Sequence, residues 1–387
     1  MREAARVQAA IEILDRVIEA ARHNGAAADT IIADWIRGHR YAGSKDKRAI
    51  RDHVYAAIRA FGDMPPDGRT AMGSLLGPGS ELFDGSPYGP APLTDGEAGW
   101  AKSRLPQWLA TLVPEDEHEA LLERAPLDLR INRLKAPDGK VRDRFEGASA
   151  IPGLPDAIRL SDNIRIEQHP AWSEGKVEVQ DAGSQWIVAA CGAAPGTTVV
   201  DLCAGAGGKT LALAAAMGGE GRLIACDTNR DRLQRMAPRA ERAGAAAIET
   251  RLLDPGREDQ QLRDLEGMAD IVLVDAPCSG SGTLRRNPEA RWRLTPDRLG
   301  KLNALQAHVL ALAAPLVRPG GRLVYAVCSL IRSEGAGAVD AFLAANSGWE
   351  VQPPGAFPGR IEGAGRLLTP AHDGTDGFFV ARLARRC

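Results

Sequence analysis

Short apolar runs and helical runs alternate regularly from about Val177 to the end of this chain. The apolar runs have the length of strands and lie at Thr198–Leu202, Arg222–Cys226, Ile248–Leu252, Asp270–Val274, Arg322–Val327 and Phe378–Leu383. Helical patterns separate them at Thr210–Met217, Arg230–Ala243, Pro296–Val317 and Glu334–Ala345. Alternation of this kind predicts an α/β fold, a doubly wound Rossmann-like sheet with helices on both faces.

The N-terminal part has a different pattern, which is helical. Apolar residues recur at helical spacing over residues 4–22 and again from Ile50 to Phe61. Prolines and glycines accumulate between Gly62 and Gly99, which indicates an irregular connector. We therefore expect an all-α domain, with its connector, at residues 1–115.

A small mixed unit is expected at residues 116–175, ahead of a catalytic domain at residues 176–387. Helical patterns resume at Leu105–Leu112 and Asp116–Arg124, and short strand patterns follow at Asp128–Leu134 and Ala157–Gln168. Glycine and proline turns separate these strands. The pattern is typical of a small α+β unit.

The overall charge gives no argument for nucleic acid binding by the whole chain. The 387 residues are 44% hydrophobic and 25% charged, with a net charge of −2, as in a globular protein. A local basic segment lies between Ile36 and Phe61, where Arg37, Arg40, Lys45, Lys47, Arg48, Arg51 and Arg59 are opposed only by Asp46 and Asp52. This segment could contact phosphates or form a solvated helix face, and both interpretations stay open.

The cysteines favour a reducing compartment and no metal ion. All six lie in the second half of the chain, at Cys191, Cys203, Cys226, Cys278, Cys328 and Cys387, and none is spaced as in a metal-binding Cys-x-x-Cys pair. No secretory leader precedes them, and no apolar run approaches the roughly 18 residues of a membrane span. We expect a cytoplasmic, monomeric protein.

A glycine-rich turn follows the first strand of the alternating region, from Asp201 to Thr210. A phosphate-binding P-loop would need glycine where Cys203 stands, and a dinucleotide fingerprint would need it at Thr210. S-adenosylmethionine carries no phosphate, and its binding requires a glycine turn and an acid for the ribose. Asp227 ends the next strand at the position of a ribose-binding carboxylate, and Asp254 ends the third strand and could border the adenine. The alternative is that both acids only cap helices and turns.

Two cysteines stand at the polar ends of strand-like runs. Cys278 follows Ile271–Val274, and Cys328 follows Leu323–Val327. Because the ends of parallel strands line the crevice where ligands bind, both thiols could face one bound molecule. The alternative is a pair of small buried hydrophobic residues. A serine follows each thiol, at Ser279 and Ser329, and Gly280 follows the first serine; these residues favour the chemical role.

These motifs together resemble the Sun-type family of RNA cytosine-5 methyltransferases. The resemblance covers roughly residues 125–385, and its most specific part is Pro277-Cys278-Ser279-Gly280 with the following Thr283-Leu284-Arg285-Arg286-Asn287-Pro288. The N-terminal helices are similar, more weakly, to a NusB-like RNA-binding domain. One departure is Arg332-Ser333-Glu334-Gly335, where the family often has a proline, acids and asparagine.

The resemblance implies a function: formation of 5-methylcytosine in RNA, with ribosomal RNA of the 16S type as substrate and S-adenosylmethionine as cofactor. It implies Cys328 as the nucleophile, Cys278 as the residue that assists release, and Asp275 at both the cofactor and the base. The reverse assignment of the two thiols, as in DNA cytosine methyltransferases, stays open. Transfer RNA or DNA as substrate, and an RNA assembly factor with incidental methyl transfer, are the alternatives.

The expected binding residues form two sets. The cofactor set comprises Cys203, Ala204, Gly205, Ala206, Gly207, Gly208, Lys209, Asp227, Asp254 and Asp275. The RNA set comprises Arg130, Asn132, Arg285, Arg286 and Asn287, with Arg291 and Arg293 nearby. We expect phosphate contacts from the arginines that follow Cys278, and a target cytosine turned outward to reach the thiols.

Overall fold

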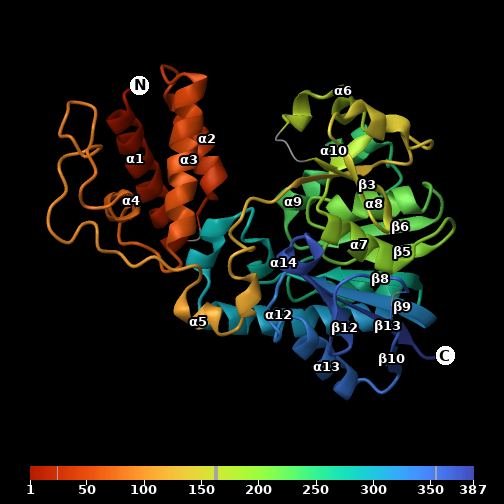
Figure 1. Ribbon diagram of the computed structural model, residues 1–387. Helices are drawn as coiled ribbons and strands as arrows, with labels where there is room; N and C mark the ends of the chain where they lie inside the picture. Colours follow the sequence, from red (N-terminus) through yellow and green to blue (C-terminus); the bar gives the residue numbers. More distant parts are fainter. Residues whose placement is uncertain (24, 161–163, 354) are drawn as a thin grey trace. The chain divides into compact units, whose positions relative to one another are not determined.

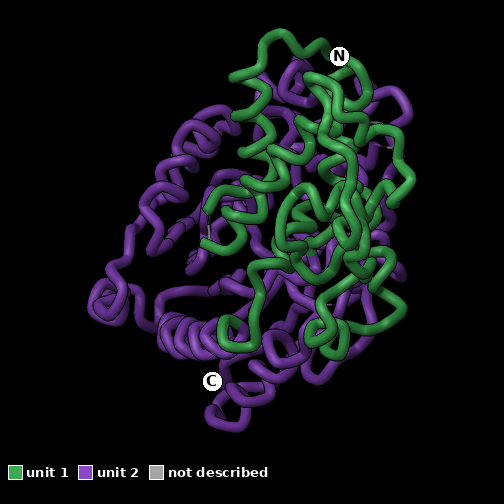
Figure 2. The backbone as a smooth tube through the Cα atoms, turned by 90° about the vertical axis from the view of Figure 1, so that its left-hand side faces the viewer, with its two compact units in different colours: residues 1–124, 283–298 green, residues 125–282, 299–387 purple. Residues whose placement is uncertain are grey.

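The computed structural model describes residues 1–23, 25–160, 164–353 and 355–387. The chain divides into two compact units. Unit 1 comprises Met1–Arg124 and Thr283–Arg298, and unit 2 comprises Ala125–Gly282 and Leu299–Cys387 (Figure 2). This division differs from the expected three domains, because the small sheet groups with the large one and a segment from the second half of the chain belongs to the N-terminal unit. No helix among the described residues is long and apolar enough to cross a membrane.

Unit 1 is helical, as the N-terminal pattern predicts (Figure 1). Its helices are α1 (Glu3–Arg22), α2 (Ala28–Gly38), α3 (Ser44–Ala60), α4 (Gly68–Leu76) and α5 (Gln107–Ala110), with 3-10 turns η1 (Glu115–Glu117), η5 (Ser281–Thr283, continuing from unit 2) and η6 (Pro288–Arg293). Fully buried side chains of α1, α2 and α3, including Leu14, Ile32 and Ile58, build its core. Burial of these apolar faces is the main source of helix stability.

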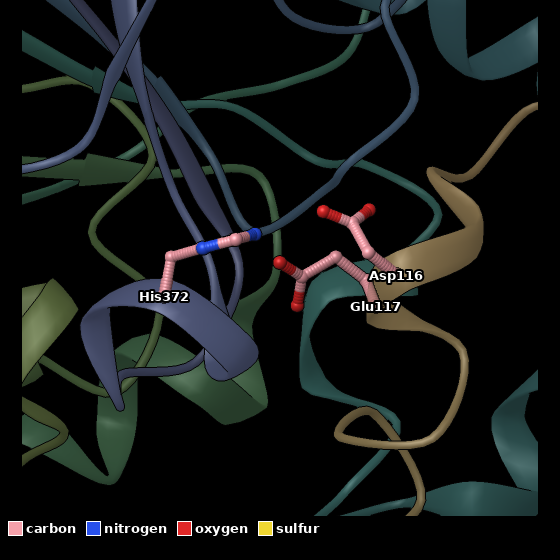
Figure 3. Close-up of side chains that lie close together, drawn as sticks. All are labelled: Asp116, Glu117 and His372. Atoms are coloured by element: carbon pink, nitrogen blue, oxygen red, sulfur yellow. The ribbon is translucent and has the colours of Figure 1, made fainter.

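Two predictions for unit 1 are wrong. The region Gly62–Gly99, expected to be irregular, contains α4, whose N-terminus is capped by Asp67 accepting from the Thr70 backbone N–H at 2.6 Å. Residues 116–124, expected to be helical, form only the turn η1 and irregular turns after it. Asp116 and Glu117 project from η1 (Figure 3).

A four-stranded antiparallel sheet opens unit 2. Its strands lie in the order β2 (Ser149–Ile151), β3 (Leu154–Leu160), β1 (Leu127–Ile131) and β4 (Val177–Val179), and short helical segments η2 (Lys140–Arg144), η3 (Ile166–Gln168) and α6 (Pro170–Ser173) connect them. Of the strand expected at Ala157–Gln168, the first part belongs to β3. Residues 161–163 lie outside the described residues, and Ile166–Gln168 is a 3-10 turn.

The large sheet of unit 2 confirms the predicted doubly wound fold. Its described strands are β11 (Arg360–Glu362), β12 (Gly365–Leu368), β13 (Phe378–Arg385), β9 (Val317–Val327), β8 (Ala269–Asp275), β5 (Thr198–Asp201), β6 (Arg222–Asp227) and β7 (Glu249–Leu252) in spatial order, with β10 (Trp349–Val351) beside β13. The pairs from β7 to β9 are parallel, and β13 is antiparallel to β9.

Helices cover both faces of this sheet (Figure 1). They are α7 (Ala182–Cys191), α8 (Gly208–Ala216), α9 (Arg230–Gln234), α10 (Met236–Ala243), α11 (Glu258–Leu262), α12 (Pro296–Ala313), α13 (Ala336–Ala345) and α14 (Pro370–Asp373), with 3-10 turns η4 (Arg263–Leu265) and η7 (Ala314–Leu316). From β5 the chain proceeds to β6 and β7 and then returns to place β8 on the other side of β5. Ligands bind at the carboxyl ends of strands at such a switch point.

Candidate active site

The two thiols meet at the carboxyl edge of the large sheet. Cys278 follows β8, Cys328 follows β9, and these neighbouring strands are parallel. The two sulfur atoms lie 3.3 Å apart, and both side chains are partly buried. The expectation that both thiols lie at one sheet edge is therefore confirmed. We call this pair, at the ends of β8 and β9, the thiol edge.

The glycine turn after β5 has the backbone that a closely approached ligand requires. Gly205 and Gly207 adopt positive φ angles of 56° and 85°, which favour glycine. A Cβ atom at Gly207 would also lie 2.6 Å from Met236 Cγ. The Gly205 N–H donates to Asp227 Oδ2 at 2.8 Å, and Arg239 Nη1 donates to the Ala206 carbonyl at 2.7 Å. The turn is thus held by both β6 and α10.

The two acids of the expected nucleoside site have different surroundings. Asp227, at the end of β6, accepts from the backbone N–H groups of Gly205 and Asn229. Asp254 is exposed and forms a reciprocal pair with Gln261, whose side chain accepts from the Asp254 N–H and donates to Asp254 Oδ2. Asp227 is therefore an integral part of the glycine turn, whereas Asp254, beyond the end of β7, is bonded to Gln261 of α11.

An ion pair lies beside the thiol edge. Lys209 Nζ, at the start of α8, is 2.6 Å from Asp275 Oδ2 at the end of β8. Burial by itself lowers the pKa of Lys209, but the charge of Asp275 and their hydrogen bond outweigh burial and leave this pKa above its ordinary value. Lys209 also interacts electrostatically with Cys328. A permanent positive charge therefore stands near both Asp275 and one thiol.

The cysteines differ in their electrostatic surroundings. The hydrogen bond with Cys328, followed by burial, raises the pKa of Cys278 well above its ordinary value, so Cys278 stays protonated at neutral pH. Burial raises the pKa values of Cys191 and Cys226 to about 12, and it also raises that of Cys203. These three have the character of structural thiols.

Arg130 and Asn132, expected to contact RNA, lie in the protein interior. Arg130 Nε donates to Gln180 Oε1 at 2.7 Å, and Gln180 Nε2 donates to the Gly208 carbonyl. Asn132 Nδ2 donates to the carbonyls of Gly175 and Ala243, at 2.8 Å each. Both side chains are almost fully buried, which argues against direct RNA contact. Arg130 therefore supports the glycine turn through Gln180. The sequence position of Gln180 alone does not reveal this supporting role.

The arginines after the thiol motif also differ from the expectation. Arg291 is fully buried and donates to the carbonyls of Ile58 and Phe61, at 2.6 and 3.0 Å. Arg293 donates to the carbonyls of Gly25 and Ala26. These two residues therefore join their segment to the helices of unit 1, and the assignment of both to the RNA backbone is replaced by this structural role.

The three remaining residues of the RNA set lie earlier in the same segment. Arg285 is buried, Arg286 is half-buried and Asn287 is exposed. Among these three residues, Asn287 is therefore the most exposed to solvent. Contact with RNA stays a prediction for Arg285, Arg286 and Asn287.

Comparison with known proteins places these motifs in one family. The family model described as 16S rRNA methyltransferase RsmB/F matches residues 189–384. A probable ribosomal RNA small subunit methyltransferase B of Synechocystis is 35% identical over 302 residues, 73% of this chain and 67% of the relative. This chain belongs to the RsmB/F family of 16S rRNA methyltransferases. The RsmB relative of Xanthomonas campestris is 34% identical over 306 residues, 76% of this chain and 68% of the relative.

Solved structures agree with this membership. A methyltransferase homologue from Pyrococcus horikoshii has a TM-score of 0.60 at 27% identity, over 70% of this chain and 90% of that chain. NSun6 from the same organism shares the fold, with a TM-score of 0.63 at 19% identity over 72% of this chain and 97% of that chain. As an RsmB/F methyltransferase the chain uses S-adenosylmethionine as its methyl donor, and the open glycine turn with Asp227 beside it fits this group.

Proposed function

We propose that this RsmB/F chain methylates carbon 5 of a cytosine in 16S-type ribosomal RNA through a covalent bond between Cys328 and the base. The observation that carries this proposal is the 3.3 Å separation of the Cys278 and Cys328 sulfur atoms at the carboxyl edge of the sheet. Carbon 5 of cytosine is a poor nucleophile, so the ring must first be activated by a thiolate. Ribosomal RNA as substrate is supported by the family and would place the reaction in the cytoplasm.

The residues around the glycine turn would hold S-adenosylmethionine. The turn from Cys203 to Lys209 would accommodate its amino acid part, Asp227 would accept from the ribose hydroxyls, and Asp254 would border the adenine. When bound, S-adenosylmethionine supplies a methyl group on a positively charged sulfur. Asp275 lies between β5 and β9 in the sheet, where it can face both this group and the target base.

Cys328 forms and then breaks a bond to the ring. Its thiolate adds to carbon 6, and the electron pair of the double bond between carbons 5 and 6 moves to carbon 5, which takes the methyl group. Carbon 5 then gives its proton to a water molecule, and the electron pair of that carbon–hydrogen bond re-forms the double bond between carbons 5 and 6. The bond between carbon 6 and sulfur breaks at the same time, and its electron pair returns to Cys328. Lys209 places a positive charge near Cys328 throughout.

Cys278 assists the release of Cys328. Its raised pKa keeps it protonated, so its S–H can donate to the Cys328 sulfur as that sulfur leaves with a negative charge. Asp275, paired with Lys209, is positioned to accept a hydrogen bond from the amino group of cytosine, and from its ring nitrogen once that nitrogen carries a proton. This arrangement favours Cys328 as nucleophile over the reverse assignment.

Unit 1 would supply part of the RNA affinity. Its helices α2 and α3 carry exposed cations at Arg37, Lys45, Arg48 and Arg51. Between these helices lie the exposed Arg40 and Tyr41, and Tyr41 is 72% exposed. Cations that neutralise phosphates, with an aromatic side chain on which a base can stack, are typical of single-stranded RNA binding. This patch supports an RNA-binding role for unit 1.

Bisulfite sequencing tests the proposal directly. RNA from a strain that lacks this chain is compared with RNA from its parent, and the purified protein is then given the unmodified 16S-type RNA, transfer RNA and DNA. We expect one cytosine of the 16S-type RNA to lose its methyl group in the deletion strain and to regain it in vitro. Methylation of transfer RNA or DNA alone would show that the enzyme performs the same reaction on another substrate. If none of the three substrates is methylated, the protein is better explained as an RNA assembly factor.

A further inference from the structure

Glu334 is a buried carboxylate that has no part in the reaction described so far. It follows Cys328 by six positions, between β9 and α13, and its exposed fraction is 0%. Burial of a charged group is costly unless its oxygens are hydrogen-bonded. The partners of Glu334 therefore indicate what the residue contributes.

The carboxylate of Glu334 bonds to both cysteine-bearing loops. Oε1 accepts from the Ser279 backbone N–H at 2.7 Å, and Oε2 accepts from the hydroxyls of Ser279 and Ser329. Ser279 directly follows Cys278, and Ser329 directly follows Cys328. One side chain thus holds the residues next to both sulfur atoms.

Further hydrogen bonds make this connection rigid. Gln306 Nε2, from α12, donates to Glu334 Oε1 and to the Pro277 carbonyl, at 3.0 Å each. The Tyr325 hydroxyl, from β9, donates to the Glu334 carbonyl at 2.6 Å. Both the acid and the start of the Cys278 loop are therefore tied to neighbouring elements. A network of this kind in the protein interior restricts its members to one arrangement.

We propose that Glu334 is a positioning residue that sets the distance between the Cys278 and Cys328 sulfur atoms by binding both of their loops. The proposal rests on the proposed function, because the distance matters if one thiol bonds the base and the other assists release. The negative charge of Glu334 also contributes, after the hydrogen bond with Cys328 and burial, to the raised pKa of Cys278. Glu334 therefore acts on the chemistry only through the two cysteines.

Phenylarsine oxide measures this distance without any methylation. The reagent forms two arsenic–sulfur bonds with a pair of adjacent thiols, and its oxygen leaves with the two thiol protons as water. We expect the wild-type protein to bind one equivalent tightly and Cys278→Ser to lose this binding. Glu334→Gln should weaken it by about tenfold, the loss expected for one charge-assisted hydrogen bond.

Kinetics separate positioning from folding. Glu334→Gln should lower kcat by about tenfold, with the KM for RNA unchanged because the residue is fully buried. Ser329→Ala, which removes one of the two loop contacts, serves as a second variant if Glu334→Gln unfolds. The matched control is Asp340→Asn, an exposed acid on α13 that pairs with Arg332.

The results have distinct meanings. Wild-type arsenical affinity and wild-type kcat in both Glu334→Gln and Ser329→Ala would overturn the positioning role. Weaker arsenical affinity in both variants, with wild-type affinity in Asp340→Asn, supports the role even if the RNA substrate proves to be different. Loss of arsenical binding by the wild-type protein itself would contradict the thiol geometry and with it the proposed function.

Discussion

The thiol edge and the segment 283–298 that follows the Cys278 loop use their polar side chains in opposite ways. At the thiol edge, Cys278 and Cys328 are partly buried and bond chiefly to each other. In the segment, Arg291 is fully buried and bonds to backbone carbonyls of α3 and its end. Both stretches are dense in motif residues. The difference shows that the contacts of its side chain decide whether a motif residue takes part in the reaction or stabilises the fold.

Removal of the nucleophile should give the largest effect. Cys328→Ala should lower kcat by at least about 10³-fold, as for other covalent nucleophiles, because carbon 5 is then never activated. Its free energy of unfolding should stay close to that of the wild type. Methyl incorporation into RNA and chemical denaturation measure the two quantities. If Cys328→Ala retains substantial activity, Cys328 is not the nucleophile and has a structural role like that of Arg291.

Arg291→Met should lower the free energy of unfolding, whereas Cys328→Ala should lower kcat. It leaves the Ile58 and Phe61 carbonyls without the guanidinium donor, and we expect unit 1 to lose about 3 kcal/mol of unfolding free energy. The matched control is Arg293→Met, a half-buried arginine with two carbonyl partners, which should cost about 1 kcal/mol. Wild-type stability of Arg291→Met with weakened RNA affinity would restore the RNA contact expected from the sequence.

Substitution of Asp227 tests whether the glycine turn binds S-adenosylmethionine. Asp227→Ala removes the acceptor of the Gly205 N–H and the expected ribose contact, and it should weaken S-adenosylmethionine binding by about tenfold or more. Isothermal titration with the cofactor alone measures this affinity. Asp231→Asn, an exposed acid on α9, is the control. Equal affinity of Asp227→Ala and the wild type would remove Asp227 from the cofactor site.

The stability of the protein should also depend on pH through Asp201, a buried acid at the end of β5. Burial, its largest cause, raises the pKa of Asp201 to about 7. The folded state therefore binds a proton that the unfolded state releases near its ordinary pKa of about 4. The unfolding free energy should fall as the pH rises from about 4 to about 7, and Asp201→Asn should make this slope smaller. Denaturation at several pH values in this range measures the slope, and an equal slope in both proteins contradicts the shift.

The sequence predicts the large sheet well because buried strands and their ends carry strong local patterns. The strands β5, β6 and β8, the glycine turn and the meeting of Cys278 with Cys328 all follow from apolar runs and the order of a doubly wound sheet. The start of β9 does not, because Pro319 and Gly320 have the pattern of a turn but lie within a strand that begins at Val317. Local patterns thus predict where the thiols lie.

Contacts between distant residues cannot be predicted in this way. Arg291 bonds to the Ile58 carbonyl, 233 positions earlier in the chain, and its sequence neighbours suggest only a basic segment. Glu334 stands in a departure from the family pattern, and its role depends on the serines of two separate loops. The helix α4 is hidden in a region rich in proline and glycine, where one capping residue, Asp67, decides its start.

The most direct test of the central claim is to map the covalent protein–RNA adduct by mass spectrometry. Cys278→Ala is incubated with unmodified 16S-type RNA and S-adenosylmethionine, digested, and searched for a cysteine peptide that carries a nucleotide. We expect the adduct to accumulate on Cys328, because the bond to carbon 6 forms but is released slowly. An adduct on Cys278 in the Cys328→Ala protein, with none on Cys328 in Cys278→Ala, would contradict the assignment of the two thiols.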